Sequence, residues 1–289
     1  MQLRGTLMIL LASFFWGTTF VAQMTGMEGL GPFSYAASRF TLGFIFLLIV
    51  WLTQRKKIIR KRNYKSGFIA GIGAGLFMFT ASSMQQVSML YTTAGKAAFI
   101  TCLYIVLVPL GAVFLGKLIR TENWLGAFLA LFGLYLLAIH EDFTFQIGDL
   151  ILFISSFFWT AQILFIDKFA SKVDALELSV AQIFVCMTLS FFAMLIFESP
   201  TVEAVGSAWF SILYGGILSA GVAFTLQVFG QKYADPSTAA IVMSFESIFG
   251  AVSSWLILGE VMNGRELFGC FLMFMGVIVT QFRILIGRK

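Results

Sequence analysis

The sequence predicts an all-α integral membrane protein whose ten transmembrane helices form two inverted five-helix repeats around a central cavity. Three observations predict this class: an apolar composition, ten apolar runs of spanning length, and a second half that resembles the first. Hydrophobic residues make up 59% of the 289 residues and charged residues only 11%, against about 45–50% and about 25% in soluble domains. Because so few charged residues could not cover a surface exposed to water, we expect the chain to lie in a lipid bilayer.

The apolar runs have the length of about 20 residues that a helix needs to cross a hydrocarbon core of about 30 Å. The predicted spans are 5–24, 34–53, 66–89, 94–116, 122–139, 148–168, 175–197, 207–231, 236–258 and 264–284. A β-barrel is excluded because barrel strands alternate over about ten residues, whereas these runs are apolar on all faces. The first run resembles a signal peptide after Arg4, but no small-residue cleavage site follows it, so we interpret it as a spanning helix.

Local signals mark several helix ends and one kink. Three pairs resemble N-terminal caps of spans 7, 10 and 9. They are Asp174 with Glu177, Asn263 with Glu266, and Asp235 with Pro236. Pro109 should kink span 4. Glycines in spans 3 and 8 are interpreted as sites of close helix packing, with a hinge as the second interpretation. They are Gly71, Gly73, Gly75, Gly215 and Gly216.

Basic residues predict the orientation of the chain. Seven lie between spans 2 and 3, and others follow spans 4, 6 and 10, all on the side of Arg4. These residues are Arg55, Lys56, Lys57, Arg60, Lys61, Arg62, Lys65, Lys117, Arg120, Lys168, Lys172, Arg283, Arg288 and Lys289. The opposite side carries mainly carboxylates, with Arg265 as its one clear basic loop residue. By the positive-inside rule, both termini should be cytoplasmic.

The second half resembles the first at an offset of 142–143 residues. Ser13-Phe14-Phe15-Trp16 returns as Ser156-Phe157-Phe158-Trp159. Further matches are Gly73 with Gly215, Gln85 with Gln227, Tyr91 with Tyr233, Gly126 with Gly269, and Gly133 with Gly276. We expect one repeat at 1–143 and the other at 144–289. Because each holds five spans, an odd number, the second enters the membrane from the opposite side, as in many secondary transporters.

Several motifs give the chain a resemblance to a known family. They are Ser13-Phe14-Phe15-Trp16-Gly17-Thr18-Thr19-Phe20, Ala36-Ala37-Ser38-Arg39-Phe40, Tyr91-Thr92-Thr93-Ala94-Gly95-Lys96-Ala97-Ala98, Leu258-Gly259-Glu260, and Phe245-Glu246-Ser247-Ile248-Phe249, where Ser247 replaces the family's proline. In their order and spacing the chain resembles the drug/metabolite transporter superfamily, EamA type. The resemblance implies a central cavity, movement of metabolites or amino acids, often export, and a bacterial cell (plasma) membrane.

Three ionisable residues lie inside the predicted spans, where charge is costly. Glu246, near the middle of span 9, could bind a substrate amine or carry a coupling proton; the alternative is a neutral structural carboxyl. Lys96 could hold an anionic substrate group or extend to the interface. Arg39 is interpreted as a structural intramembrane charge that anchors helix packing. A pair between Glu246 and Lys96 is expected if spans 4 and 9 meet.

A second set of candidates is polar or aromatic and lies on repeat-equivalent helices. Trp16 and Thr19 share a face of span 1 by their i, i+3 spacing, and Trp159 and Gln162 repeat the arrangement in span 6. The remaining candidates are Gln85, Gln227 and Tyr104, the last being the repeat mate of Glu246. Together they predict a mainly apolar substrate cavity with a few polar groups. The alternatives are packing for the tryptophans and interhelical hydrogen bonds for the glutamines.

The best-supported function is a secondary transporter, with export of a small metabolite such as an amino acid by alternating access. A membrane-embedded enzyme lacks support because no catalytic or nucleotide-binding motif occurs, and a channel or scaffold remains the other alternative. Cys102, Cys186 and Cys270 are widely spaced and His140 is the only histidine, so no metal or cofactor is expected. The expected partners are a small-molecule substrate and membrane lipids, without nucleic acid; a homodimer is left open.

Overall fold

The computed structural model of the chain describes residues 2–27, 29–59, 64–92, 94–139, 146–258 and 262–285. Within these ranges every regular element is a helix, and ten helical segments are long and apolar enough to cross a membrane. The all-α, ten-span prediction is confirmed. The boundary predicted between residues 143 and 144 falls in the segment 140–145, which lies outside the described residues.

The spans are made of fifteen helical elements, some of which join end to end. They are α1 (Gln2–Met27), α2 (Pro32–Ile59), α3 (Tyr64–Ser88), α4 (Ala94–Thr101), α5 (Tyr104–Phe114), α6 (Thr121–Ala138), α7 (Ile147–Ala170), α8 (Ala175–Phe197), α9 (Val202–Ser207), α10 (Trp209–Tyr214), η1 (Gly215–Ala223), α11 (Phe224–Gln231), α12 (Pro236–Met243), α13 (Phe245–Leu258) and α14 (Gly264–Leu285). The short helix α9 was not predicted.

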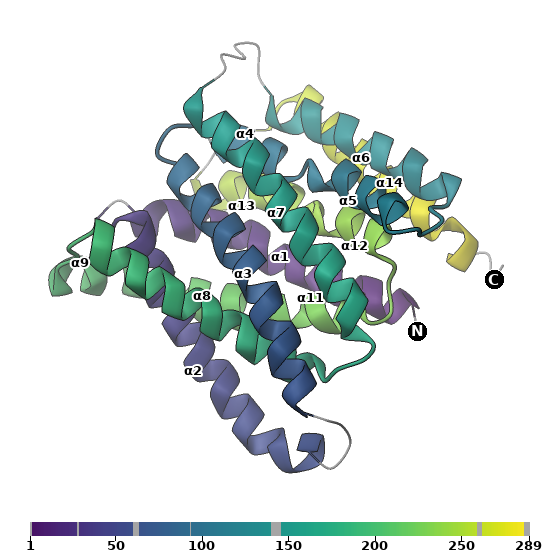
Figure 1. Cartoon of the computed structure of the whole chain (residues 1–289). Coiled ribbons are helices and arrows are strands. Elements are labelled where there is room, and N and C mark those ends of the chain that lie inside the picture. Colours follow the sequence, from purple (N-terminus) through teal and green to yellow (C-terminus); the bar gives the residue numbers. More distant parts are fainter. Residues whose placement is uncertain are drawn as a thin grey trace.

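Figure 1 shows α6 and α14 side by side, and glycines set their separation. A Cβ added at Gly133 would lie 2.5 Å from the carbonyl oxygen of Gly269, and one at Gly126 would lie 2.7 Å from that of Gly276. Because the contact order reverses between the two pairs, the helices run antiparallel. Gly133 thus contacts Gly269, the repeat mate of Gly126, and Gly126 contacts Gly276, the repeat mate of Gly133. This is the pattern expected where two equivalent helices cross at a two-fold axis.

Close glycine contacts also join the two repeats elsewhere, between span 3 and span 7 and between span 8 and span 2. A Cβ at Gly71 in α3 would lie 2.5 Å from the carbonyl oxygen of Leu178 in α8, and one at Gly216 in η1 would lie 2.8 Å from that of Arg39 in α2. Small residues let backbones approach closely in a membrane, where packing and not water exclusion drives helix association. The packing interpretation of these glycines is confirmed.

All three predicted cap residues accept hydrogen bonds, but Glu177 does not complete the capping box predicted for it with Asp174, because both of its carboxyl oxygens are buried without a hydrogen-bond partner. Asp174 accepts hydrogen bonds from the backbone N–H groups of Leu176 and Glu177 at 2.9 and 3.3 Å. Asp235 accepts one from Thr238 at 2.9 Å. The backbone N–H groups of Asn263 and Glu266 donate reciprocally to each other's side chains, at 2.8 and 3.0 Å, at the start of α14. Such caps satisfy backbone donors that would otherwise have no partner at a helix start.

Spans 4 and 9 are not the single helices that were predicted. Each is interrupted by a tightened turn, between α4 and α5 and between α12 and α13. Within the first turn the Ile105 N–H donates to Cys102 at 2.9 Å, and within the second the Ser247 N–H donates to Ser244 at 3.1 Å. These are i to i−3 bonds, the 3₁₀ pattern that often marks a functional hinge inside a helix.

The interruption of span 4 does not coincide with Pro109, from which a kink was predicted. Pro109 lies inside α5, several residues after the interruption, and the equivalent turn at Ser244 has no proline near it. Both turns occur at the same repeat position, which indicates that the packing around them, and not a missing N–H group, produces them.

Span 8 contains a π-helical stretch between α10 and α11. The N–H group of Phe224 donates to the carbonyl of Ser219, five residues earlier. This widened turn brings residues 219 and 224 to the same face, whereas an α-helix would separate them by their spacing. π-helical turns are rare and are frequent at functional sites.

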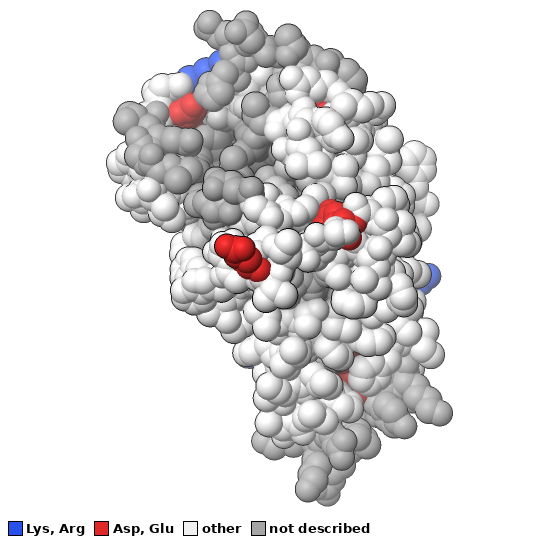
Figure 2. Space-filling model, turned by 90° about the vertical axis from the view of Figure 1, so that its left-hand side faces the viewer, with Lys and Arg blue, Asp and Glu red and all other residues white. Residues whose placement is uncertain are grey.

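The two ends of the molecule differ in charge. In Figure 1 both termini lie on one side and α9 lies on the other. Figure 2, which views the α9 side, shows patches of acidic residues and only marginal basic ones. The side chains of the basic loop 55–65 and of residues 283–289 lie outside the described residues. Few basic residues therefore lie on the face opposite the termini.

Candidate functional site

A cavity lies between the two halves of the chain, and residues from both halves line it. Its volume is about 60 Å³. Because one water needs about 10–15 Å³, the cavity has room for several waters or for a small head group. The lining residues are Trp16, Phe20, Gln23, Arg39, Ser82, Gln85, Gln86, Thr101, Tyr104, Trp159, Ile163, Ser219, Phe224, Gln227, Met243 and Glu246.

Glu246 lies where the two interrupted helices meet. Its Oε1 accepts a hydrogen bond of 3.1 Å from the hydroxyl of Tyr104 and a contact of 3.5 Å from the Sγ of Cys102. Cys102 belongs to the turn that joins α4 to α5, Tyr104 opens α5, and Glu246 lies in the first turn of α13. The two tightened turns thus direct the repeat mates Tyr104 and Glu246 toward each other. The other carboxyl oxygen of Glu246, Oε2, makes no hydrogen bond within the described part of the chain.

The predicted pair between Glu246 and Lys96 receives no test. Lys96 belongs to α4, but its side chain lies outside the described residues.

The aromatic and amide candidates form two contacts that are not symmetric. The indole N–H of Trp159 donates to the Oε1 of Gln85 at 3.1 Å. Gln162 and Gln227 exchange hydrogen bonds of 3.4 and 3.0 Å. The indole nitrogen of Trp16, the repeat mate of Trp159, is buried without a partner.

The ring of Phe224 lies between the two tryptophans. Its centroid is 4.8 Å from that of Trp16 and 6.1 Å from that of Trp159, the latter pair being stacked at 9°. Offset aromatic stacking of this kind stabilises the wall of the cavity beyond simple burial. A flat or apolar ligand surface could pack against the same rings.

Six of the predicted cavity residues line the cavity and two do not. Those that line it are Trp16, Gln85, Tyr104, Trp159, Gln227 and Glu246. Thr19 is fully buried and donates to the carbonyl of Phe15 in its own helix, and Gln162 lies one layer behind Gln227. The prediction paired each tryptophan with the residue three positions on, whereas the cavity face of α1 follows Trp16, Phe20 and Gln23, at i, i+4 and i+7.

The sequence reasoning missed nine lining residues. They are Phe20, Gln23, Ser82, Gln86, Thr101, Ile163, Ser219, Phe224 and Met243. The i+4 rule alone would have found Phe20 and Ile163 from the two tryptophans, and Ser82 lies three positions before the predicted Gln85. No sequence signal marks Ser219, because the π-helical turn brings it to the cavity face.

Arg39 also lines the cavity, although it was predicted as a structural charge. Its side chain is only 5% exposed. The guanidinium carbon lies 4.6 Å from the centre of the Phe40 ring, a cation–π distance. A buried cation and a buried carboxyl thus share one cavity.

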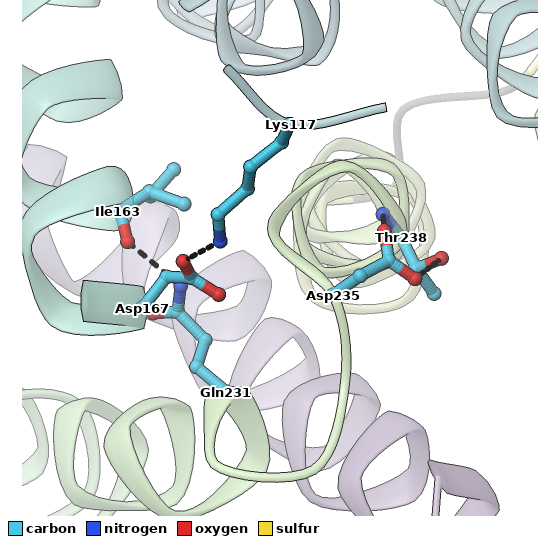
Figure 3. Close-up of polar contacts among 6 residues, drawn as sticks. All are labelled: Lys117, Ile163, Asp167, Gln231, Asp235 and Thr238. Carbon is cyan, nitrogen blue, oxygen red and sulfur yellow. Dashed lines mark hydrogen bonds and ion pairs between the residues drawn. The ribbon is translucent and has the colours of Figure 1, made fainter. Parts of the chain in front are cut away.

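Beyond the cavity, towards the side of the termini, one ion pair joins the two halves (Figure 3). Lys117 contacts Asp167 of α7, and α7 also accepts a hydrogen bond of 3.0 Å at the Ile163 carbonyl from Gln231. Gly116, with φ of 78°, ends α5: the N–H groups of Gly116 and Lys117 donate to Val113 and Ala112, each at 2.9 Å. This Schellman arrangement directs the chain so that Lys117 reaches α7.

Comparisons with known proteins agree with this architecture. The model of the EamA-like transporter family matches residues 3–139 and 146–282. An uncharacterized transporter of Archaeoglobus fulgidus is 28% identical over 284 residues, covering 98% of this chain and 87% of that protein. The uncharacterized transporter YoaV of Bacillus subtilis is 23% identical and covers 95% of both chains.

A solved structure supports the fold. It superposes with a TM-score of 0.81 at 22% sequence identity and covers 96% of each chain; a likeness at this identity carries the fold alone. The two family matches cover most of the chain, each with five of the ten spans. This multi-pass membrane protein is therefore a transporter and belongs to the EamA-like transporter family.

Proposed function

We propose that the protein is a secondary transporter that exports a small metabolite, such as an amino acid, by alternating access across a bacterial plasma membrane. The observation that carries this proposal is the shared cavity, at which an interrupted helix of each half meets its repeat mate through Tyr104 and Glu246. Secondary transporters commonly place their sites between repeats, on helices interrupted near the bilayer midplane.

An inverted arrangement of the halves fits this mechanism. Five spans in each repeat reverse the direction of the second repeat, and the antiparallel glycine contacts between α6 and α14 agree with that reversal. The positive-inside distribution then places both termini in the cytoplasm and the acidic α9 side outside.

Two contacts between the halves lie on opposite sides of the cavity. On the side of the termini, Lys117 binds Asp167. On the α9 side, Glu198 accepts hydrogen bonds from the backbone N–H groups of Phe33 and Ser34 at 2.9 and 2.7 Å, at the start of α2. Alternating access would require these contacts to break in turn, since each joins one repeat to the other.

Glu246 is the proposed central residue. One of its oxygens is held by Tyr104 and Cys102, which leaves the other for a ligand. As a carboxylate it would bind a substrate amine through a charge-assisted hydrogen bond; as a neutral acid it would donate a proton for coupling. Either role requires the carboxyl group itself.

Counterflow in proteoliposomes tests the proposal. Vesicles loaded with an unlabelled amino acid or related metabolite should accumulate the labelled compound from outside, and empty vesicles should not. A channel would equilibrate the label without this trans-stimulation, an enzyme would return it chemically changed, and a scaffold would show no flux. Uptake into inside-out but not right-side-out cell vesicles would establish export.

Reversing the charge at Lys117 should slow transport. Because the Lys117 side chain is 44% exposed, its ion pair with Asp167 contributes little to the free energy that holds the two halves together. We therefore expect Lys117→Glu to slow counterflow only about 2- to 5-fold. The double variant Lys117→Glu with Asp167→Lys should restore the rate. Labelling of a cysteine introduced beside the pair should rise in the single variant.

Lys168→Glu serves as the matched control, because Lys168 is exposed and lies next to Asp167 on α7. Equal slowing by Lys168→Glu, or no recovery in the double variant, would show that the ion pair has no role in gating.

A further inference from the structure

Arg39 is a buried cation without a counterion. Its side chain is 5% exposed and lines the cavity, and its Nε is enclosed without a hydrogen-bond partner. In the described part of the chain the guanidinium makes no ion pair and no side-chain hydrogen bond. Its recorded neighbours are the rings of Phe40 and Tyr35, whose centres lie 4.6 and 5.7 Å from the guanidinium carbon.

An unpaired charge is expensive inside a membrane protein. Cation–π contacts offset only part of that cost, and they satisfy none of the N–H donors of the guanidinium. The planar fork of arginine matches a carboxylate, which can accept two parallel hydrogen bonds. The guanidinium of Arg39 therefore lacks the anionic hydrogen-bond acceptor that its charge and geometry call for.

Two further polar atoms of the lining residues are enclosed without partners. They are the indole nitrogen of Trp16, which can only donate, and the hydroxyl of Thr101. Enclosed polar atoms without partners also occur away from the cavity, on Trp51, Gln182 and Gln281 among others. Arg39, which carries a full charge, is therefore the group that points to an anionic ligand.

The remaining features of the cavity restrict that ligand. Glu246 has one oxygen engaged by Tyr104 and would repel a dianion such as a phosphate monoester. One cation and one carboxyl in a medium of low dielectric constant match a ligand that carries one charge of each sign. The rings of Trp16, Phe224 and Trp159 provide a surface for an apolar group.

We propose that Arg39 is a substrate-binding residue that takes a carboxylate, so that the cargo is a zwitterion of the α-amino-acid type with an apolar side chain. The ammonium group of this cargo faces Glu246, and its carboxylate faces Arg39. The inference rests on the proposed transport function and adds to it the substrate class and the residue that selects it.

Binding to the purified wild-type protein tests the carboxylate requirement. The probes are L-leucine, L-methionine and L-phenylalanine, each compared by calorimetry with its amide and its decarboxylated amine. These derivatives keep the side chain and the amine and lose only the carboxylate. We expect at least one acid to bind about 10- to 100-fold more tightly than its amide, the range for a hydrogen bond to a charged group.

Variants at position 39 assign the effect to arginine. Arg39→Gln should weaken binding of the acid about 10- to 100-fold and leave binding of the amide and the amine within about twofold. Arg39→Lys, which keeps the charge but loses the fork, should recover part of the affinity for the acid. Thr41→Ala is the matched control, because Thr41 lies on the same helix, donates to the carbonyl of Ala37 and does not line the cavity.

The outcomes separate this inference from the transport function. Equal binding of acid and amide to the wild type, or equal weakening of both by Arg39→Gln, would refute the role of Arg39. If Arg39→Gln fails to fold, the wild-type comparison and Arg39→Lys still decide. Absence of binding by every probe would refute the cargo class; counterflow of another metabolite would then keep the transporter proposal, whereas absence of all counterflow would refute that proposal as well.

Discussion

Replacing Glu246 with glutamine is expected to impair transport strongly while the folded protein remains in the membrane. Glutamine has nearly the same shape, and its amide oxygen can still accept the hydrogen bond that Tyr104 donates to Glu246 at 3.1 Å. The variant loses only the ability to ionise. If the carboxylate binds an amine, affinity should fall about 10- to 100-fold; if the acid carries the coupling proton, proton-driven flux should disappear.

The controls are Glu203→Gln and Glu246→Asp. Glu203 lies in the first turn of the exposed helix α9 and does not line the cavity, so the glutamine variant should leave transport unchanged. Aspartate keeps the charge at position 246 but withdraws it, so partial activity is expected. Wild-type rates for both transport and proton movement in Glu246→Gln would leave Glu246 with a structural role alone.

The second large effect is expected at Gly133, where α6 crosses α14. Valine there would bring its Cβ to the position that lies 2.5 Å from the carbonyl oxygen of Gly269 and 2.8 Å from the backbone nitrogen of Met273. Backbone atoms of a packed helix cannot move aside as a flexible side chain could. We expect destabilisation of about 3 kcal/mol, the upper end for an overpacked core, with loss of the monodisperse peak in fluorescence-detected size exclusion.

Gly264→Ala provides the comparison, because a Cβ at Gly264 meets no heavy atom within 4 Å. Gly133→Ala should give an intermediate loss of thermal stability, since alanine adds the clashing Cβ without the branches of valine. A Gly133→Val protein with the melting temperature of the wild type would show that the two helices can separate at no cost.

The sequence predicts those features whose physics is local. A run of about 20 apolar residues must become a helix in lipid because no other partner exists for its backbone groups. Asp174, Asp235 and Asn263 were recognisable as caps because each bonds to N–H groups two or three residues away. The packing role of the glycines in spans 3 and 8 was recognisable because small residues let helices approach closely in a membrane.

Features set by packing were not predictable. The tightened turns at Cys102 and Ser244 carry no proline or glycine, and Pro109 suggested a kink elsewhere. The cavity face of α1 was assigned one step away, because i+3 and i+4 neighbours of Trp16 both lie near it on a helix. The placement of Arg39 in the cavity depends on how α2 packs against η1, which no single helix reveals.

The contact between Tyr104 and Glu246 also bears on leakage. The hydrogen bond joins the interrupted helix of one half to that of the other. While it holds, a displacement of either interrupted helix must move the other. A passage open at both ends at once would short-circuit the ion gradient of the cell. In the proposed mechanism, two hinges that share a single bond cannot swing independently while that bond holds, so the contact would also limit leakage of ions.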